Sequence, residues 1–362
     1  MIRCPIPTSM SIAEPIPALF DSPDALRQAF EDGLVRMVEQ PVLGAFVLAL
    51  ANAGFEPRMW QRLRPSLHAA FAVWCRRFDH ADRIVNDAAP DDIEVFVRLR
   101  QLGLDRLTAT RWREVGPWQV QFNPLRALRP PRASGATLSG LHRPFDADGF
   151  HFNKAFLRRE IFWEGELCGA PLRLLYNKFP FAERHGLLVP YPERCRPQYL
   201  GAEDHALVWR LVERLGHRLS GLGVGYNAYG AYASINHLHF QCFLRGHGSY
   251  PIESAQWRHN GGDRDYPLPV VRVDDPGAAW SEVEALHAAR QAYNLLYRPG
   301  VLYAVARRRQ GEYTHSDWTN GFAWSELCGA VTTFDEGDFT RLSAEQIERE
   351  MARLALPGGA AD

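Results

Sequence analysis

The sequence predicts an α+β protein in which a helical region precedes an antiparallel sheet with packed helices. Apolar residues recur at helical spacing from residue 20 to residue 105, whereas the chain from Trp118 onward changes to shorter segments with strand character. Residues 170–243 then suggest the order strand, turn, strand, helix and hairpin, which is typical of an antiparallel layer. We therefore expect an N-terminal helical region over residues 1–115 and a second domain over residues 116–362.

The N-terminal region is expected to contain four helices. The first begins at Ser22-Pro23-Asp24, because a capping hydroxyl precedes a proline at the first helical position. Apolar residues at helical spacing mark four segments: Leu26, Phe30 and Leu34; Leu43, Phe46, Val47 and Leu50, ending at Gly54; Leu63, Leu67, Phe71 and Trp74; and residues 91–102. Such stripes predict a helical core rather than a cofactor site.

Composition excludes several classes of protein. The 362 residues include 41 Lys and Arg against 42 Asp and Glu, and a formal net charge of −1 lacks the basic footprint of a nucleic-acid binder. The six cysteines form no CxxC pair, which argues against a zinc ribbon and a dense disulfide framework and favours a reducing cytoplasm. Neither a signal-peptide block nor an apolar run of membrane-spanning length is present, so we expect no membrane partner.

The candidate site is the segment His237-Leu238-His239-Phe240-Gln241. In a β-strand, His237, His239 and Gln241 would share one face, while Leu238 and Phe240 would face the core on the other. Two imidazoles and an amide in a row suit the successive groups of one elongated polar ligand. The pentapeptide therefore indicates a binding or catalytic site.

Two other interpretations of the histidine pair stay open at this point. Alternate strand positions can chelate a metal, but Cys242, His247 and Glu253 fall at no recognised zinc spacing. A structural pair that only satisfies hydrogen bonds is the second alternative.

Glycines 221, 223, 225 and 230 precede the pentapeptide. A phosphate-binding loop would need a Lys-Ser or Lys-Thr and a following helix, and neither is present. We expect these glycines to form a turn with residues at positive φ.

The spacing of further residues carries a family resemblance. Asn227 lies on the preceding expected strand, and Ser234 stands three residues before His237. Asn177-Lys178-Phe179-Pro180 and His185-Gly186-Leu187-Leu188-Val189-Pro190 match an earlier signature at each spacing. With them, residues 170–243 resemble the nucleotidyltransferase and phosphorylase branch of the histidine triad (HIT-like) superfamily, whose pattern is His-x-His-x-Gln. The resemblance implies a HIT-like fold.

Two subfamilies of that branch are similar to different parts of the chain. NHLHFQ followed by Tyr250-Pro251-Ile252-Glu253, together with YNLLYRPGVLYAV and FAWSELCGAV, looks like the GDP-hexose phosphorylases. LLYNKFPFAERHGLLV is closer to the diadenosine tetraphosphate phosphorylases. The likeness extends over residues 118–350 and leaves the helical first hundred residues unmatched.

The resemblance implies roles for the central residues. His239 matches the family nucleophile, and a neutral imidazole anchored through its second nitrogen by a backbone carbonyl can attack the α-phosphorus of a nucleotide. His237 would hydrogen-bond the transferring phosphate, with Ser234 and Asn227 as supporting donors. Gln241 stands where hydrolases have a third histidine. An amide cannot transfer a proton but can hydrogen-bond a phosphate oxygen, so Gln241 favours exchange between phosphorylated partners.

Other residues are candidates for contacts with the nucleotide. Asn177 matches the family position that holds the ribose hydroxyls, and His185 is either a ligand or a structural support. Lys178, Arg245 and residues 307–309 are candidates for the distal phosphates, although the arginine run is equally typical of a solvated turn.

The loop over NPLRALRPPRASGATLSG carries three more arginines, Arg126, Arg129 and Arg132. They are either phosphate ligands or solvated surface charge.

The expected reaction is phosphorolysis of a nucleotide sugar to a nucleoside diphosphate and a sugar 1-phosphate, with inorganic phosphate as second substrate. A dinucleoside polyphosphate phosphorylase and a non-catalytic nucleotide-binding protein are the alternatives. The chemistry demands no cofactor or metal, and a divalent cation accompanying the nucleotide stays open. A homodimer stays open too, by analogy with the wider superfamily.

Overall fold

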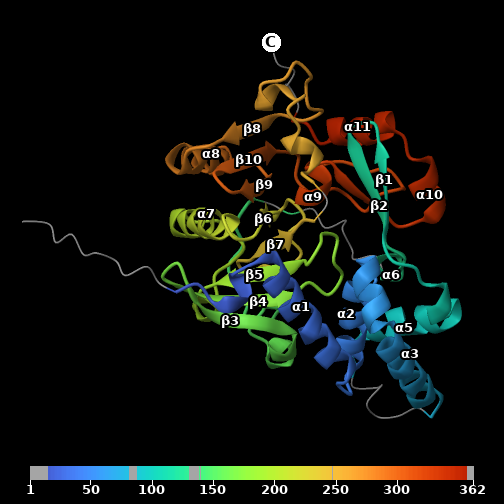
Figure 1. The fold of residues 1–362 in the computed structure, drawn as a ribbon. Coiled ribbons are helices and arrows are strands. Elements are labelled where there is room, and N and C mark those ends of the chain that lie inside the picture. Colours follow the sequence, from blue (N-terminus) through green and yellow to red (C-terminus); the bar gives the residue numbers. More distant parts are fainter. Residues whose placement is uncertain (1–14, 81–87, 130–137, 139, 247, 357–362) are drawn as a thin grey trace, which may run out of the picture.

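The computed structural model describes residues 15–80, 88–129, 138, 140–246 and 248–356, and its organisation is the expected α+β one (Figure 1). The helical stripes are confirmed as α1 (Pro23–Val38), α2 (Leu43–Ala53), α3 (Pro57–Asp79) and α5 (Pro90–Leu102). The Ser22 hydroxyl accepts a hydrogen bond from the Ala25 amide at 3.1 Å, as the capping pattern predicts. These helices enclose an apolar core of their own, to which Tyr176 and Phe179 also contribute.

An antiparallel sheet of eight strands forms the centre of the described structure, in the order β3-β4-β5-β7-β6-β9-β10-β8. Its strands are β3 (Ile161–Leu167), β4 (Ala170–Tyr176), β5 (Gly186–Pro190), β6 (Leu222–Asn227), β7 (Phe240–Leu244), β8 (Val270–Val273), β9 (Tyr293–Arg298) and β10 (Val301–Ala306). The expected pair of strands over residues 170–190 is therefore confirmed, as is the hairpin that leads into β7.

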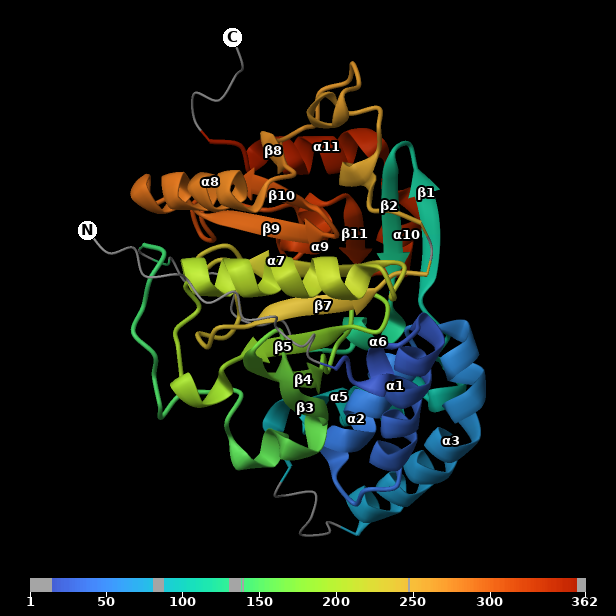
Figure 2. The ribbon, with the colours of Figure 1, turned by 60° about the vertical axis from the view of Figure 1, so that its left-hand side comes forward.

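Each face of the large sheet packs on its own layer. Helices α7 (Ala202–Gly216) and α8 (Pro276–Ala288) lie along one face, as Figure 2 shows, over the core that contains Leu238 and Phe240. A smaller sheet of β1 (Arg111–Val115), β2 (Trp118–Phe122) and β11 (Ala330–Thr333) shares an apolar core with the other face, together with α9 (Trp324–Leu327), α10 (Glu336–Arg341) and α11 (Ala344–Arg353).

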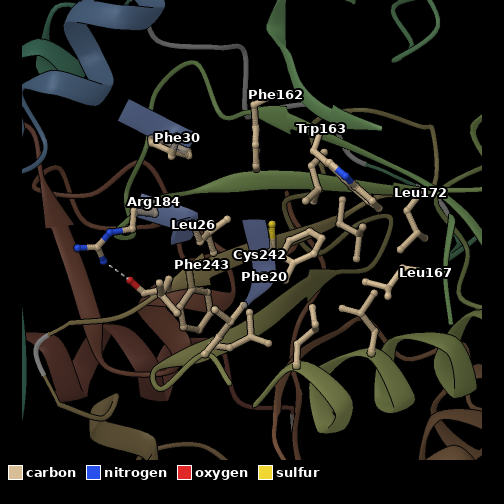
Figure 3. A pocket seen from close by; sticks show the side chains of 17 residues that line it. Phe20, Leu26, Phe30, Phe162, Trp163, Leu167, Leu172, Arg184, Cys242 and Phe243 are labelled. Carbon is tan, nitrogen blue, oxygen red and sulfur yellow. Dashed lines mark hydrogen bonds between the residues drawn. The ribbon is translucent and has the colours of Figure 1, made fainter. Parts of the chain in front are cut away.

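An apolar cavity lies on the α7 side of the sheet. It is bounded by α1, α7 and strands β3 to β7, with Phe20, Trp163 and Leu172 among its lining residues (Figure 3). Cys242 lines it, whereas Gln241, one residue earlier on β7, must face the opposite side of the sheet because side chains alternate. Neither the two histidines of the candidate site, His237 and His239, nor Gln241 is among the residues that line the cavity.

Two local expectations change. The segment after Asn123 begins as a short helix, α6 (Pro124–Ala127), because the Asn123 side chain caps it by accepting from two backbone amides. Only two of the four glycines, Gly221 and Gly230, have positive φ. Gly225 lies within β6, where a Cβ atom would come 2.3 Å from the Trp324 ring, so close packing rather than a turn demands glycine there.

The expected boundary between residues 115 and 116 falls inside the β1–β2 hairpin, in which Val115 pairs with Trp118. The division of the chain into two domains stays a prediction. Among the described residues, no helix combines the length and the hydropathy that crossing a bilayer would require.

Candidate active site

The two histidines lie immediately before β7 rather than within it. The expectation of one continuous strand is wrong, because the backbone there bonds to a loop instead of to a neighbouring strand. The Leu238 amide donates to the Arg196 carbonyl at 2.8 Å, and strand pairing with β5 starts only at Phe240. Both imidazoles nevertheless face one aromatic ring, since the centroid of Phe152 lies 5.6 Å from that of His237 and 5.0 Å from that of His239.

The His239 ring has a defined proton position. Its Nδ1 atom lies 2.8 Å from the backbone carbonyl oxygen of His237. A carbonyl oxygen can only accept, so Nδ1 carries the proton and Nε2 keeps its lone pair. Burial lowers the pKa of His239 to about 4, so the imidazole is neutral at pH 7. A neutral ring with a bare Nε2 is the form that a nucleophile requires.

The His237 ring holds the opposite tautomer. Its Nδ1 accepts a hydrogen bond from the Phe152 amide at 3.1 Å, so its proton lies on Nε2. Burial, followed by the charges of His239 and His151, lowers the pKa of His237 to about 3. At neutral pH, Nε2 of His237 is therefore a hydrogen-bond donor. Phe152 was not predicted as part of the site.

Gln241 is oriented by two donors. The Phe181 amide donates to Nδ1 of His185 at 3.3 Å, so the proton of this ring lies on Nε2, which donates to Oε1 of Gln241 at 2.9 Å. The indole nitrogen of Trp324 donates to the same oxygen at 3.3 Å. With its oxygen occupied, the half-buried amide can present its NH₂ group to a ligand.

His185 acts as a support in this arrangement. It is fully buried, and burial together with the nearby charge of Arg126 lowers its pKa to about 3. Of the two interpretations of His185, the structural one therefore accounts for both of its ring nitrogens. Asn177 lies next to it, with Nδ2 3.3 Å from the His185 Nε2 atom and Oδ1 accepting from the Phe179 amide at 3.0 Å.

Gln198, in the loop before α7, holds the backbone of His239 through hydrogen bonds. Its Oε1 accepts from the His239 amide at 2.8 Å, and its Nε2 donates to the carbonyls of His239 at 3.1 Å and Asn227 at 2.9 Å. It is almost completely buried. Sequence analysis missed Gln198, because a glutamine in a proline-containing loop belongs to no spacing pattern.

Asn227 joins three elements at the end of β6. Its Oδ1 accepts from Nδ2 of Asn294 on β9 at 2.6 Å and from the amide of Trp324 at the start of α9 at 3.0 Å. Ser234, by contrast, is exposed in the loop between β6 and β7. Contacts of Asn227 and Ser234 with a nucleotide stay predictions.

Two basic candidates are engaged with other protein groups. The Nζ atom of Lys178 lies 2.5 Å from Oδ1 of Asp92 on α5. Arg245 is buried after the end of β7, where it donates to Oε1 of Gln119 and lies 4.0 Å from the centroid of the Tyr250 ring. It is four residues beyond Gln241, or about 13 Å along an extended chain. Their contacts with distal phosphates stay predictions.

In the arginine run at residues 307–309, the interpretation as a solvated turn is wrong for Arg307, whereas contacts of the run with distal phosphates stay predictions. Arg307 is fully buried and donates to the Phe322 carbonyl, with its guanidinium 5.0 Å from the centroid of the Tyr232 ring. Arg308 donates to the Ala355 carbonyl at 2.8 Å. Because buried carbonyls need donors, these arginines connect the C-terminal segments.

Arg126 and Arg129 pack on the connection between β4 and β5, residues 177–185, which we call the strap. Arg126 donates to the Phe179 carbonyl at 2.6 Å, and the Arg129 guanidinium lies 4.9 Å from the centroid of the Phe179 ring. The interpretation as solvated charge is therefore wrong for both. Arg132 lies outside the described residues.

A metal centre finds no support among the described residues, which contain no group of three or more His, Cys, Asp or Glu side chains able to hold an ion. His247, one of the ligands considered, lies outside them. The donors that converge at the candidate site are imidazole and amide nitrogens.

Comparison with known proteins identifies the segment that carries these residues. Residues 118–243 match the family described as GDPGP1-like, N-terminal domain. On the basis of this similarity, we refer to the segment as the GDPGP1-like domain. It spans β2 to β7 and so contains the strap, Gln198, both site histidines and Gln241.

Part of the chain is similar in sequence to curated phosphorylases. GDP-D-glucose phosphorylase 1 of Homo sapiens is 34% identical over 145 residues, which cover 38% of this chain and 36% of that protein. GDP-L-galactose phosphorylase 2 of Arabidopsis thaliana is 28% identical over 154 residues, covering 38% of this chain and 35% of that protein. These matches span little more than a third of the curated relatives. The resemblance to the GDP-hexose phosphorylases is confirmed, at the level of distant homology.

A solved structure, yeast Ap4A phosphorylase Apa2, is similar over a longer stretch, with 16% identity and a TM-score of 0.49 over 73% of this chain and 94% of that chain. The N-terminal helices precede residue 118 and so lie outside the family match over residues 118–243, as expected for the first hundred residues.

Proposed function

We propose that this protein catalyses phosphorolysis of a nucleotide sugar of the GDP-hexose class through a covalent nucleotidyl-histidine. The observation that carries the proposal is the hydrogen bond from Nδ1 of His239 to the His237 carbonyl, which leaves a neutral ring with Nε2 available. The family match of residues 118–243 and the similarity of the chain to GDP-hexose phosphorylases support the choice of substrate class.

In the first step, Nε2 of His239 forms a bond to the α-phosphorus of the nucleotide sugar. The bond from that phosphorus to the bridging oxygen breaks, and the electron pair leaves with the sugar 1-phosphate. The ring gains a positive charge, which the Nδ1–H bond to the His237 carbonyl stabilises. His237, protonated on Nε2, would donate to a nonbridging oxygen of the transferring phosphate.

In the second step, an oxygen of inorganic phosphate attacks the same phosphorus. The bond between phosphorus and His239 breaks, its electron pair returns to Nε2, and a nucleoside diphosphate forms. Both leaving groups, sugar phosphate and imidazole, depart without a proton from an acid catalyst. The NH₂ group of Gln241 suits both steps, because it can donate to a phosphate oxygen throughout and holds no transferable proton.

The test is a panel of GDP-hexoses and diadenosine tetraphosphate, each incubated with and without inorganic phosphate. We expect phosphate-dependent formation of GDP and hexose 1-phosphate. Phosphorolysis of the dinucleotide alone would replace the proposal with a dinucleoside polyphosphate phosphorylase. Binding without turnover of either class would replace it with a nucleotide-binding protein.

The covalent step has a separate test. A donor labelled at the α-phosphate, supplied without phosphate, should label the protein with a bond that survives alkali and breaks in acid. His239→Gly should abolish labelling, whereas replacing the exposed His217 at the end of α7 with Gln should leave it unchanged. Labelling that persists in His239→Gly would overturn the mechanism.

We also propose that the protein works in a reducing cytoplasm. The five described cysteines, Cys75, Cys168, Cys195, Cys242 and Cys328, are all free thiols, which supports this compartment.

A further inference from the structure

The N-terminal helices contact the site through the start of the strap. Asn52 on α2 donates from Nδ2 to the Asn177 carbonyl at 2.9 Å and to the Leu48 carbonyl of its own helix at 3.0 Å. It is the single polar side chain of α2 and is almost fully buried. A buried amide is unfavourable unless it is hydrogen-bonded, so the bond to Asn177 gives a reason for an asparagine within an otherwise apolar helix.

The residue before Asn177 is held by a second helix. The hydroxyl of Tyr176 donates to the Phe30 carbonyl of α1 at 2.8 Å, and the two rings pack edge to face with centroids 4.6 Å apart. Gly33 makes this approach possible, since a Cβ atom on it would lie 1.9 Å from the Tyr176 hydroxyl oxygen.

The residue after Asn177 is held by a third helix. Lys178 pairs with Asp92 near the start of α5, and the Asp92 carboxylate is buried. A Cβ atom on Gly44 of α2 would lie 2.7 Å from Oδ2 of Asp92 and 3.2 Å from Nζ of Lys178. Glycine is a poor helix former, so Gly33 and Gly44 are both explained by the room that they leave for strap contacts.

The far end of the strap is tied to the same region. Arg184, labelled in Figure 3, lies 3.0 Å from Oε2 of Glu56, the residue that precedes α3. It also donates to the Leu244 carbonyl at 2.6 Å. The side chains of Arg184 and Glu56 are both largely shielded from solvent. The nine-residue strap is therefore held by the N-terminal region at both ends.

The strap in turn orients the amide of Gln241. Its Phe181 amide sets the tautomer of His185, and His185 donates to Oε1 of Gln241. Asn52 is thus connected to Gln241 through the Asn177 backbone, the strap and His185. Displacing the strap would change the direction of the NH₂ group that faces the ligand.

We propose that the N-terminal helical region supports catalysis by holding the strap, with Asn52, Asp92 and Glu56 as positioning residues for Gln241. The proposal rests on the function proposed above. It assigns a role to helices that precede the GDPGP1-like domain.

The decisive variant is Asn52→Leu, which removes the donor to Asn177 at similar volume. Its matched control is Arg62→Met, which breaks the ion pair between Arg62 and Glu31, 2.5 Å apart, within the same helices but away from the strap. Two readouts apply: exchange of the His185 Nε2 proton with solvent, followed by NMR without substrate, and kcat and KM for phosphorolysis.

We expect Asn52→Leu to speed proton exchange by about tenfold or more and to lower kcat by about tenfold to a hundredfold, with a smaller change in KM. Arg62→Met should change neither readout. Should Asn52→Leu fail to fold, Asp92→Asn and Glu56→Gln carry the same expectation.

The inference would be overturned if the variants that weaken the strap contacts exchanged the His185 Nε2 proton and turned over substrate at wild-type rates. An equal loss of kcat in Arg62→Met would also overturn it. An inactive wild-type protein would overturn the proposed function instead, while the exchange measurement would still decide whether the helices hold the strap.

Discussion

His237 and His239 hold opposite tautomers although they are two residues apart. His239 donates from Nδ1 to the His237 carbonyl, whereas His237 accepts at Nδ1 from the Phe152 amide. We therefore expect the nitrogen chemical shifts at pH 7 to show a protonated Nδ1 in His239 and a protonated Nε2 in His237. Identical tautomers in the two rings would contradict the assigned roles of nucleophile and donor.

The lowered pKa of His239 predicts an unusual pH profile for adduct formation. With a pKa of about 4, His239 stays neutral well below the usual histidine range, and its reactive form is lost only as the pH falls through that value. The single-turnover rate of labelling without phosphate should change by less than about twofold between pH 8 and pH 5.5. An acid limb with a midpoint near an ordinary histidine pKa would show that the ring is less shielded than the structure indicates.

Stability should fall on acidification, in part through His185. Its folded pKa of about 3 lies below that of an unfolded histidine, so between the two values the unfolded chain binds more protons. The free energy of unfolding thus decreases as pH falls from neutral toward 3, by up to about 1.4 kcal/mol per pH unit for this ring. In His185→Leu, urea unfolding between pH 6 and pH 4 should show a slope reduced by up to that amount. An unchanged slope would mean that His185 titrates normally.

Substitutions of Gln241 should separate hydrogen bonding from charge. Gln241→Ala removes one donor to the phosphate and should lower kcat by about a hundredfold to a thousandfold. Gln241→Glu keeps an oxygen for His185 and Trp324 but puts a negative oxygen where the NH₂ group was, so its loss should be larger. Steady-state kinetics with phosphate in excess measure both. Equal activity of Gln241→Glu and wild type would exclude a phosphate contact from this side chain.

Replacing Gln198 should affect both the labelling rate of His239 and the free energy of unfolding. Gln198→Leu leaves the buried amide and carbonyl of His239 without their partner, which costs about 1–3 kcal/mol of unfolding free energy for each unsatisfied group. We expect labelling of His239 to slow by at least about tenfold, because the proposed nucleophile loses the hydrogen bonds that hold its backbone. Arg194→Ala in the preceding exposed ion pair with Glu203 is the control and should label normally. Normal labelling in Gln198→Leu would assign Gln198 a role in stability alone.

Features with a local cause were predicted from the sequence. The N-terminal helices follow from apolar spacing and a capping serine, and the α+β order follows from segment lengths and turns. The His-x-His-x-Gln pattern lies within the segment that matches the GDPGP1-like family model, as its resemblance to known phosphorylases implies. These signals lie within a few residues of one another, so a chain that has not folded already carries them.

Tertiary structure alone decided the proton positions and the burial of the candidate-site residues. Phe152 is 85 positions from the ring whose tautomer it sets, and Gln198 is 41 positions from the backbone that it clamps. Arg307 is buried because folding brings it to the Phe322 carbonyl, to which it donates a hydrogen bond. Sequence spacing reports which side chains can share an element, whereas proton positions and burial depend on partners that only folding brings within hydrogen-bond distance.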